Sequence, residues 1–172
     1  VAIADAINSF GGSGLWCPND GFYYDQLRTG GQVLPLRVRS MVGLLPLLAC
    51  TVLEEETLAR LPGFTKRMRW FLENRPDLAG HIAWAETGHG HRLLALPSRE
   101  RLARVLAYML DENEFLSPHG LRSLSRVHDD RPFALAVDGK EYGVRYTPAE
   151  SDSGLFGGNS NWRGPVWFPV NY

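Results

Sequence analysis

The sequence predicts a mainly α-helical domain, arranged as a helical array or toroid whose connecting loops gather at one end. Two stretches, Pro62–Glu73 and Ser98–Asp111, carry the spacing of amphipathic helices. A third, Arg37–Leu53, is apolar on nearly every side past Ser40, as in a helix that is buried on most faces. Strands and helices do not alternate in the manner that builds a parallel sheet. Together these observations favour helices separated by irregular, aromatic-bearing insertions and two short β elements.

The composition excludes some kinds of molecule as binding partners. Eighteen Lys and Arg residues stand against nineteen Asp and Glu, for a net charge of −1. This balance argues against a nucleic-acid-binding surface, which usually carries a basic stripe, and against a polybasic membrane patch. The longest apolar run, Met41–Leu53, is too short to span a bilayer. Cys17 and Cys50 lack a CxxC spacing, so we expect unpaired, buried thiols. With no glycosylation acceptor either, the sequence favours a cytoplasmic protein that binds neither nucleic acid nor membrane.

The N-terminal part predicts one helix end and a small β meander. Val1–Phe10 has the pattern of a helix tail that Gly11–Gly14 would end. A dinucleotide-binding loop is the alternative, but that motif follows a strand and opens a helix. Asn19–Gly21 and Thr29–Gly31 are turn signals between short aromatic segments. The aromatic residues and aspartates there either pack and support turns, or form a polar and aromatic lip at the mouth of a pocket.

The middle of the chain predicts two further helices and a loop. Glu54–Glu56 suits a solvated helix start, and the Pro62–Glu73 helix should end at Arg75-Pro76. We expect Asp77–Pro97 to be an irregular, exposed loop. It contains His89-Gly90-His91, but no third ligand lies at a spacing diagnostic of zinc, so no metal site is predicted.

The following segments predict a regular helix, a mixed loop and a hairpin. Ser98 is a good N-cap for the helix that runs to Asp111. Phe133–Tyr146 alternates around Asp138-Gly139, as a β-hairpin does. In the loop Asp111–Asp130, several polar residues are candidates to point into a site, although one histidine beside acids is more often structural or exposed. These residues are Arg122, Ser125, Arg126 and His128.

The last stretch, Glu150–Tyr172, combines glycines with aromatic residues and few charges. Glycine lets a backbone turn or approach a ligand closely, and aromatic rings beside small polar groups can stack on a ligand and bond its edge. Neutral sugars, with apolar faces and hydroxyl rims, suit that surface. Gly164-Pro165 is typical of the start of another helix, so we expect the chain to be a piece of something longer.

Four segments carry a resemblance to glycoside hydrolase family 63, the family of processing α-glucosidases and bacterial mannosylglycerate and glucosylglycerate hydrolases. NWRGPVW (Asn161–Trp167) is the most specific of them, and the others support it over essentially the whole chain. The other three are the stretch from Leu15-Trp16 through GFYYD (Gly21–Asp25), VRSMVGLLPL (Val38–Leu47) and FLSPHGLRSLSR (Phe115–Arg126).

The resemblance implies a partial (α/α)6 toroid with small β-hairpin insertions, in which residues 1–172 form one partial domain, an internal slice of the catalytic domain. It also implies inverting hydrolysis of an α-glucosidic or α-mannosidic bond by two carboxyl groups, without a metal or cofactor. The family's general acid lies in a segment like SGxDNS, and its general base is a glutamate that follows WRGP. Neither is present here, so we expect both catalytic residues outside this chain and no activity from the chain alone.

Substrate contact is the role that the resemblance leaves to this chain, with an oligosaccharide or a small α-glycoside as the partner. Trp162 would stack on a sugar ring, unless it only packs in the core. Arg163 would bond ring hydroxyls or a carboxylate on the aglycone, unless it pairs with Glu150 or Asp152. The full expected set of substrate-binding residues is Trp162, Arg163, Asn161, Asp152, Trp16, Tyr24 and Asp25.

Two alternatives remain beside the glycosidase. One is a non-catalytic carbohydrate-binding or helical scaffold domain, and the other is a helical protein-interaction module, which should show repeats of fixed period that the sequence lacks. A slice of a larger domain should also leave apolar helix faces uncovered, above all on the Met41–Leu53 helix.

Overall fold

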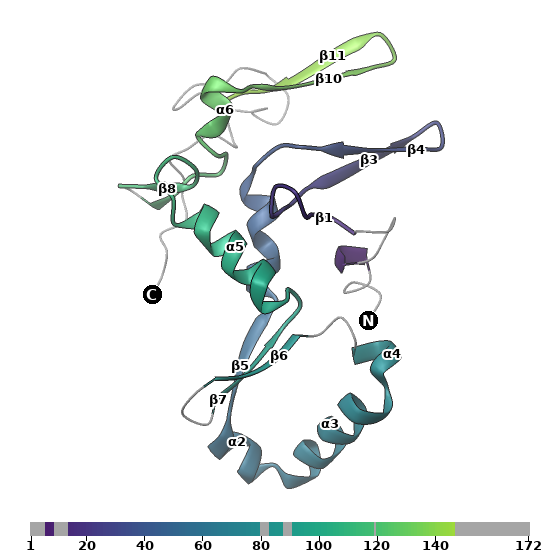
Figure 1. The fold of residues 1–172 in the computed structure, drawn as a ribbon, viewed down its shortest axis with the longest axis vertical. Helices are drawn as coiled ribbons and strands as arrows, with labels where there is room; N and C mark the ends of the chain where they lie inside the picture. The colour runs from purple at the N-terminus through teal and green to yellow at the C-terminus, as the bar shows by residue number, and fades with distance from the viewer. Residues whose placement is uncertain (1–5, 9–13, 80–82, 88–90, 119, 147–172) are drawn as a thin grey trace. The chain divides into compact units, whose positions relative to one another are not determined.

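The computed structural model describes residues 6–8, 14–79, 83–87, 91–118 and 120–146. The chain divides into two compact units (Figure 1). The first unit comprises Val1–Trp16 and Leu45–Ala103, and the second comprises Cys17–Leu44 and Arg104–Tyr172. Three elements cross the division between the units: β1 (Trp16–Cys17), the 3-10 helix η1 (Met41–Leu48) and α5 (Arg99–Met109).

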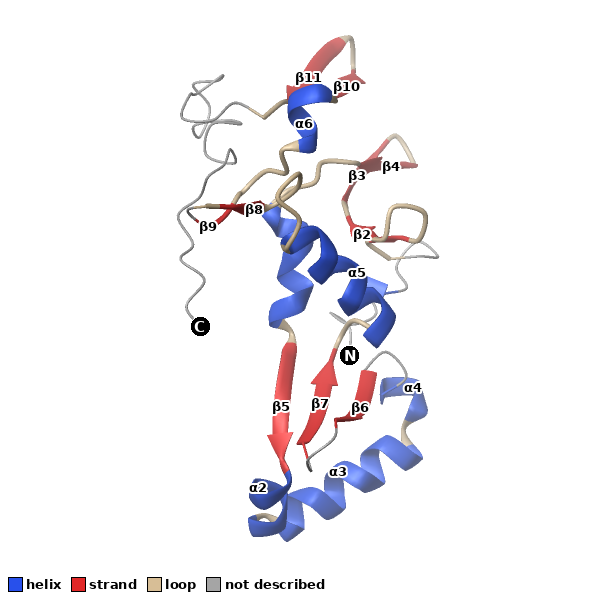
Figure 2. Ribbon diagram, turned by 60° about the vertical axis from the view of Figure 1, so that its left-hand side comes forward, coloured by secondary structure: helices blue, strands red, loops and turns tan. Residues whose placement is uncertain are grey.

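The first unit contains a three-stranded antiparallel sheet in which β7 lies between β5 and β6 (Figure 2). Leu93 of β7 pairs with Val52 on one side and with Ala85 on the other. Leu58 and Ala95 are among the buried residues of this unit. Its elements are β5 (Cys50–Glu54), α2 (Glu55–Arg60), α3 (Pro62–Asn74), α4 (Pro76–Ala79), β6 (Ala83–Thr87) and β7 (His91–Ala95).

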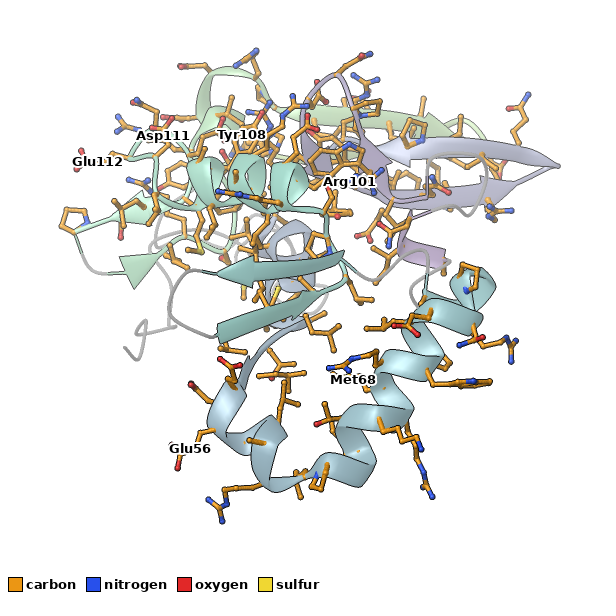
Figure 3. All side chains as sticks on the ribbon, turned by 60° about the horizontal axis from the view of Figure 1, so that its bottom comes forward. Glu56, Met68, Arg101, Tyr108, Asp111 and Glu112 are labelled. Carbon is orange, nitrogen blue, oxygen red and sulfur yellow. The ribbon has the colours of Figure 1, made fainter. Side chains whose placement is uncertain are left out.

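The two helices with clear sequence signals form where they were predicted. In α3, proline occupies the start, where its missing N–H costs no hydrogen bond. In α5, the Arg101 backbone N–H donates to Ser98 Oγ at 3.3 Å, which confirms Ser98 as the capping residue. Figure 3 shows Arg101 and Tyr108 on α5, and Met68 on α3.

The second unit is built mainly from antiparallel hairpins. β3 pairs with β4 from Asp25↔Leu36 to Thr29↔Gln32, and β10 pairs with β11 around Asp138-Gly139 as the sequence predicts. Its elements are β2 (Phe22–Tyr23), β3 (Asp25–Thr29), β4 (Gln32–Leu36), β8 (Leu116–Ser117), β9 (Gly120–Leu121), α6 (Val127–Asp130), β10 (Phe133–Val137) and β11 (Lys140–Val144).

The core of the second unit is aromatic. Phe22 and Phe115 are fully buried and stack, with ring centroids 5.9 Å apart. Tyr24 and Tyr108 meet the same Phe22 ring at centroid distances of 5.3 and 5.4 Å. Gly43 allows this packing, because a Cβ at that position would lie 2.2 Å from Phe22 Cε1. The first residues of GFYYD therefore form the centre of this core.

The turn of the β10–β11 hairpin gives a prediction that isolates backbone strain. Asp138 and Gly139 both have positive φ, 50° and 75°, as a tight two-residue hairpin turn requires. A Cβ at Gly139 would meet nothing within 4 Å, and the same holds for Gly63 in α3, whose φ is ordinary. Gly139→Ala should therefore lower the free energy of unfolding by about 1–2 kcal/mol. Gly63→Ala should raise it by a few tenths to about 1 kcal/mol.

Urea denaturation of the two variants beside the unaltered protein measures both shifts. Shifts of the same sign would contradict the assignment of the turn.

The prediction of a mainly α-helical, toroid-like fold is wrong. The described residues are divided between helices and strands in similar amounts, and the strands form several small antiparallel sheets. The Arg37–Leu53 stretch explains part of the error. It forms η1 and then strand β5, because Pro46 lacks an N–H donor and the β-branched Thr51 and Val52 favour a strand. Two further strands, β6 and β7, lie within Asp77–Pro97, where an irregular loop was predicted.

Several large apolar side chains are exposed, as the sequence led us to expect for the Met41–Leu53 region. Leu48 is 79% exposed and Val52 is 53% exposed. Cys17 and Cys50 are both free and half-buried rather than fully buried, and burial raises the pKa of the Cys50 thiol. Within the described residues, no helix has both the length and the apolar character needed to cross a bilayer.

Candidate functional site

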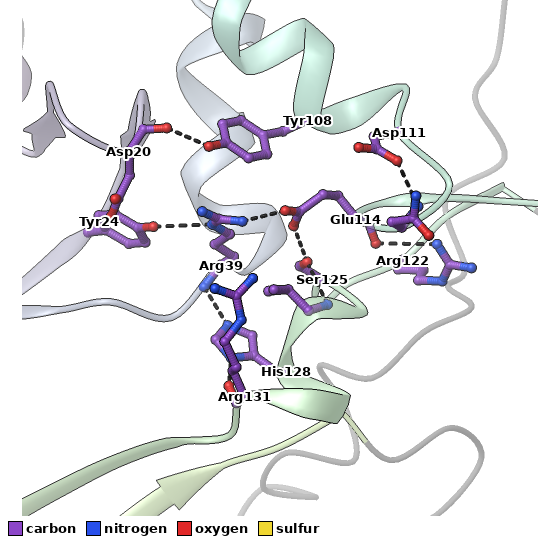
Figure 4. A network of polar contacts seen from close by, with 12 residues as sticks. Asp20, Tyr24, Arg39, Tyr108, Asp111, Glu114, Arg122, Ser125, His128 and Arg131 are labelled. Carbon is purple, nitrogen blue, oxygen red and sulfur yellow. Dashed lines mark hydrogen bonds and ion pairs between the residues drawn. The ribbon is translucent and has the colours of Figure 1, made fainter.

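A group of polar side chains, which we call the Arg39 network, links four segments of the second unit (Figure 4). Arg39 lies between β4 and η1, and its Nε donates to the hydroxyl of Tyr24 at 3.3 Å. Its guanidinium carbon also lies 4.7 Å from the ring centroid of Tyr108, within cation–π range. The network consists of Tyr24, Arg39, Glu114, Ser125 and His128.

Glu114 is the acidic centre of the Arg39 network. Its Oε1 pairs with Arg39 Nη1, and its Oε2 accepts from the Ser125 hydroxyl. The two side chains of the ion pair are only 18% and 11% exposed. Ser125 Oγ accepts in turn from the Val127 N–H at 3.1 Å. Since both carboxylate oxygens are engaged by donors, Glu114 fixes loops rather than supplying a proton to a substrate.

His128, at 5% exposure, joins the network through the backbone. The Arg39 backbone N–H donates to its Nε2 at 2.9 Å, and its Nδ1 lies 3.1 Å from the Arg131 carbonyl oxygen. Nε2 must therefore carry a lone pair while Nδ1 carries the proton, which describes a neutral imidazole. The Ser125 N–H also donates to the Arg39 carbonyl oxygen at 2.8 Å, so both backbone groups of Arg39 are held.

The protonation states in the network follow from burial and from charge. Burial raises the pKa of Tyr24 to about 12, against the opposing effect of Arg39, so the phenol stays neutral. Burial alone would lower the pKa of Arg39, but the hydrogen bond with Tyr24 and the charge of Glu114 raise it above its usual value. Burial lowers the pKa of His128, although its bond to Arg131 acts in the opposite direction. At neutral pH, Arg39 is the cation and His128 is uncharged.

A second buried arginine organises the loop that follows α5. Arg122 is 7% exposed, and its Nη1 donates to the carbonyl oxygens of Glu112 at 2.7 Å, of Glu114 at 3.2 Å and of Leu116. Its Nε donates to the hydroxyl of Tyr146 at 3.2 Å. The Tyr146 backbone N–H donates to the His128 carbonyl oxygen at 3.1 Å. The last described residue is thus tied to the same loops that carry the Arg39 network.

A small cavity lies beside the network in the second unit. It has a volume of about 220 Å³, and its polar lining comes from Asp25 and Ser40. Its apolar lining residues are Leu36, Val38, Val42, Leu124 and Val144. Apolar walls with a few placed polar groups are typical of small-molecule sites, although this volume is below the roughly 300–1,000 Å³ usual for them.

The predicted substrate-binding residues that the structure describes differ in their burial and in their contacts. Asp25 is exposed and lines the cavity, whereas Tyr24 is 5% exposed and belongs to the Arg39 network. Trp16 belongs to the first unit, is 6% exposed, and has the Arg101 guanidinium 5.1 Å from its ring centroid. The other four predicted residues lie outside the described residues: Asp152, Asn161, Trp162 and Arg163.

Sequence reasoning named Ser125 and His128 as candidates but gave no role to Arg39 or Glu114. Those two pair across 75 positions of the sequence, and each is surrounded in sequence by other charged or polar residues. Sequence reasoning gave Ser40 of the cavity no role in a site either. Among the described residues, no group of three or more side chains is suited to hold a metal ion. His89 and the rest of residues 88–90 lie outside them.

Comparison with known proteins finds similarity to the uncharacterized protein YMR196W of Saccharomyces cerevisiae, which is 49% identical over 161 residues, or 92% of this chain. The chain spans 15% of the length of that relative. No protein-family model matches the chain. No solved structure matches it either.

Proposed function

We propose that the full-length protein is an inverting glycoside hydrolase acting on α-glucosidic or α-mannosidic linkages. Residues 1–172 would contribute loops and part of the wall of its sugar pocket. The general acid and general base would come from outside these residues, because the segments that carry them in the family that the chain resembles are not found among residues 1–172. Glu114 is not a candidate for either role, since donors engage both of its oxygens. The resemblance of NWRGPVW and its companion segments to glycoside hydrolase family 63 supports this assignment.

The observation that carries the proposal is the cavity lined by Asp25 and Ser40. A carboxylate and a hydroxyl can bond the hydroxyl rim of a sugar, while the apolar residues around them can face its C–H surface. The volume of about 220 Å³ suits one sugar unit rather than a long oligosaccharide. We therefore assign Asp25 to substrate contact.

The same role is proposed for Trp162, Arg163, Asn161 and Asp152, which lie outside the described residues. For these four residues the resemblance of NWRGPVW to the family is the support.

Hydrolysis assays of the full-length protein on α-linked glucosides and mannosides test the proposal. Asp25→Asn should raise KM by roughly tenfold, because a charge-assisted hydrogen bond to a sugar hydroxyl becomes a weaker neutral one. Asp138→Asn is a matched control, since it makes the same chemical change at an exposed hairpin tip where Asn tolerates positive φ. It should leave KM unchanged.

Sugar binding that depends on Asp25 without hydrolysis would favour a non-catalytic carbohydrate-binding role. Neither hydrolysis nor binding across the substrate panel would refute the proposal.

A further inference from the structure

We propose that Arg39 is a positioning residue for the sugar site, and that it holds the two polar groups of the cavity in place only while His128 is uncharged. The kinetic part of this inference rests on the proposed function. The structural part, an acid-sensitive Arg39 network, does not.

The positioning argument follows from adjacency in the chain. Asp25 directly follows Tyr24, whose hydroxyl accepts from Arg39 Nε. Ser40 directly follows Arg39 itself, whose N–H and carbonyl are bonded to His128 and Ser125. Both polar groups of the cavity are therefore next to residues that the network fixes. Loosening Arg39 would free both of them at once.

His128 is the titratable group whose charge decides whether the network holds. Its Nε2 can accept the Arg39 N–H only without a proton of its own. A proton on Nε2 would place two N–H groups against each other. The charged groups that face the imidazole are Arg39, Arg131 and Glu114, so a new cation would meet two cations and one carboxylate that is already paired. On α6 itself, Asp129 and Asp130 are exposed.

The direction of the pH effect follows from the lowered pKa of His128, for which burial is the main cause. In the unfolded chain, histidine has a pKa of about 6.5. The stabilisation from neutral His128 is therefore fully present above about pH 6.5, and it is lost as the pH falls from there through the lower pKa of the folded state. Between those two pKa values, the equilibrium constant for opening the network should rise by up to about tenfold for each unit by which the pH falls.

Hydrogen exchange of the full-length protein tests the structural part through peptides that contain Arg39. After correction for the intrinsic pH dependence of exchange, we expect these peptides to exchange faster below about pH 6.5 and at a constant rate above it. In His128→Gln, whose neutral amide oxygen can accept the Arg39 N–H, the corrected rate should not depend on pH over this range. A flat profile for the unaltered protein, or an equal slope for His128→Gln, would overturn the proposal.

Steady-state kinetics on an α-glycoside test the positioning part. In the unaltered protein, KM should rise as the pH falls, over the same range as the exchange rate, while kcat changes by less than about twofold. His128→Gln should remove that part of the KM profile. If His128→Gln removes the pH dependence of the exchange rate but leaves the pH profile of KM unchanged, the positioning role is wrong. If no α-glycoside is hydrolysed but the pH dependence of the exchange rate is lost in His128→Gln, the proposed function is wrong and the acid-sensitive network is confirmed.

Discussion

Arg39→Met is expected to lower the free energy of unfolding of the second unit by about 3–5 kcal/mol, because it removes one partner of a buried ion pair. The Glu114 side chain, only 11% exposed, would be left without the guanidinium that pairs with it. Urea denaturation, monitored by hydrogen exchange of peptides that contain Glu114, measures the loss in free energy of unfolding. The double variant Arg39→Met/Glu114→Gln should recover part of it, because no unpaired charge then remains.

Arg37→Met is the matched control for that change. Arg37 pairs with Asp20 at 3.7 Å, but the two side chains are 56% and 25% exposed. Solvent screens such a pair, so its loss should cost less than about 1 kcal/mol. Equal losses from Arg39→Met and Arg37→Met would show that the Arg39 network does not hold the second unit together.

Phe22→Ala is the second substitution with a large expected effect, again about 3–5 kcal/mol. Phe22 is fully buried and its ring meets those of Tyr24, Tyr108 and Phe115. Removing it deletes the ring that the other three share and leaves a cavity that such large side chains cannot easily fill. Denaturant titration, monitored by hydrogen exchange of the same peptides, measures the change in free energy of unfolding.

Tyr142→Ala removes an aromatic ring of similar size from β11, where the side chain is 55% exposed. It should cost less than about 1 kcal/mol. If Phe22→Ala cost no more than Tyr142→Ala, the aromatic group around Phe22 could not be the core of the second unit.

The elements that could be predicted from sequence are specified by residues that lie close together in the chain. The hairpin around Asp138-Gly139 follows from two residues that accept positive φ between alternating segments. Helices α3 and α5 follow from a starting proline, a capping serine and a helical spacing of apolar residues. Each signal lies within a few residues of the element it specifies.

The sheet of the first unit was missed because its pairing is not local. Cys50–Glu54 pairs with His91–Ala95, which is far along the chain. A short apolar run such as the one that ends in β5 cannot be assigned to helix or strand by periodicity alone. The run was assigned to a helix because it is apolar on nearly every side, and the predicted fold class was wrong in part as a result.

The candidate site divides in the same way. Asp25 was expected to contact substrate because of the resemblance to the family, and this role stays a prediction, although Asp25 lines a cavity in the structure. Arg39 and Glu114 were missed, because a charged residue in sequence looks solvated until its distant partner is known. For Tyr24 the sequence left packing and an open lip as alternatives, and the buried side chain, bonded to Arg39 and in contact with the Phe22 ring, agrees with packing.

The measurement that tests the proposed function most directly is proton NMR of the full-length protein during hydrolysis of an α-glucoside or α-mannoside. The anomeric signals of the released sugar report its configuration before mutarotation mixes the two forms. In an inverting enzyme one carboxyl group protonates the leaving oxygen while the other activates a water molecule on the opposite face of the ring, so the β-anomer should appear first. Initial release of the α-anomer would contradict the proposal.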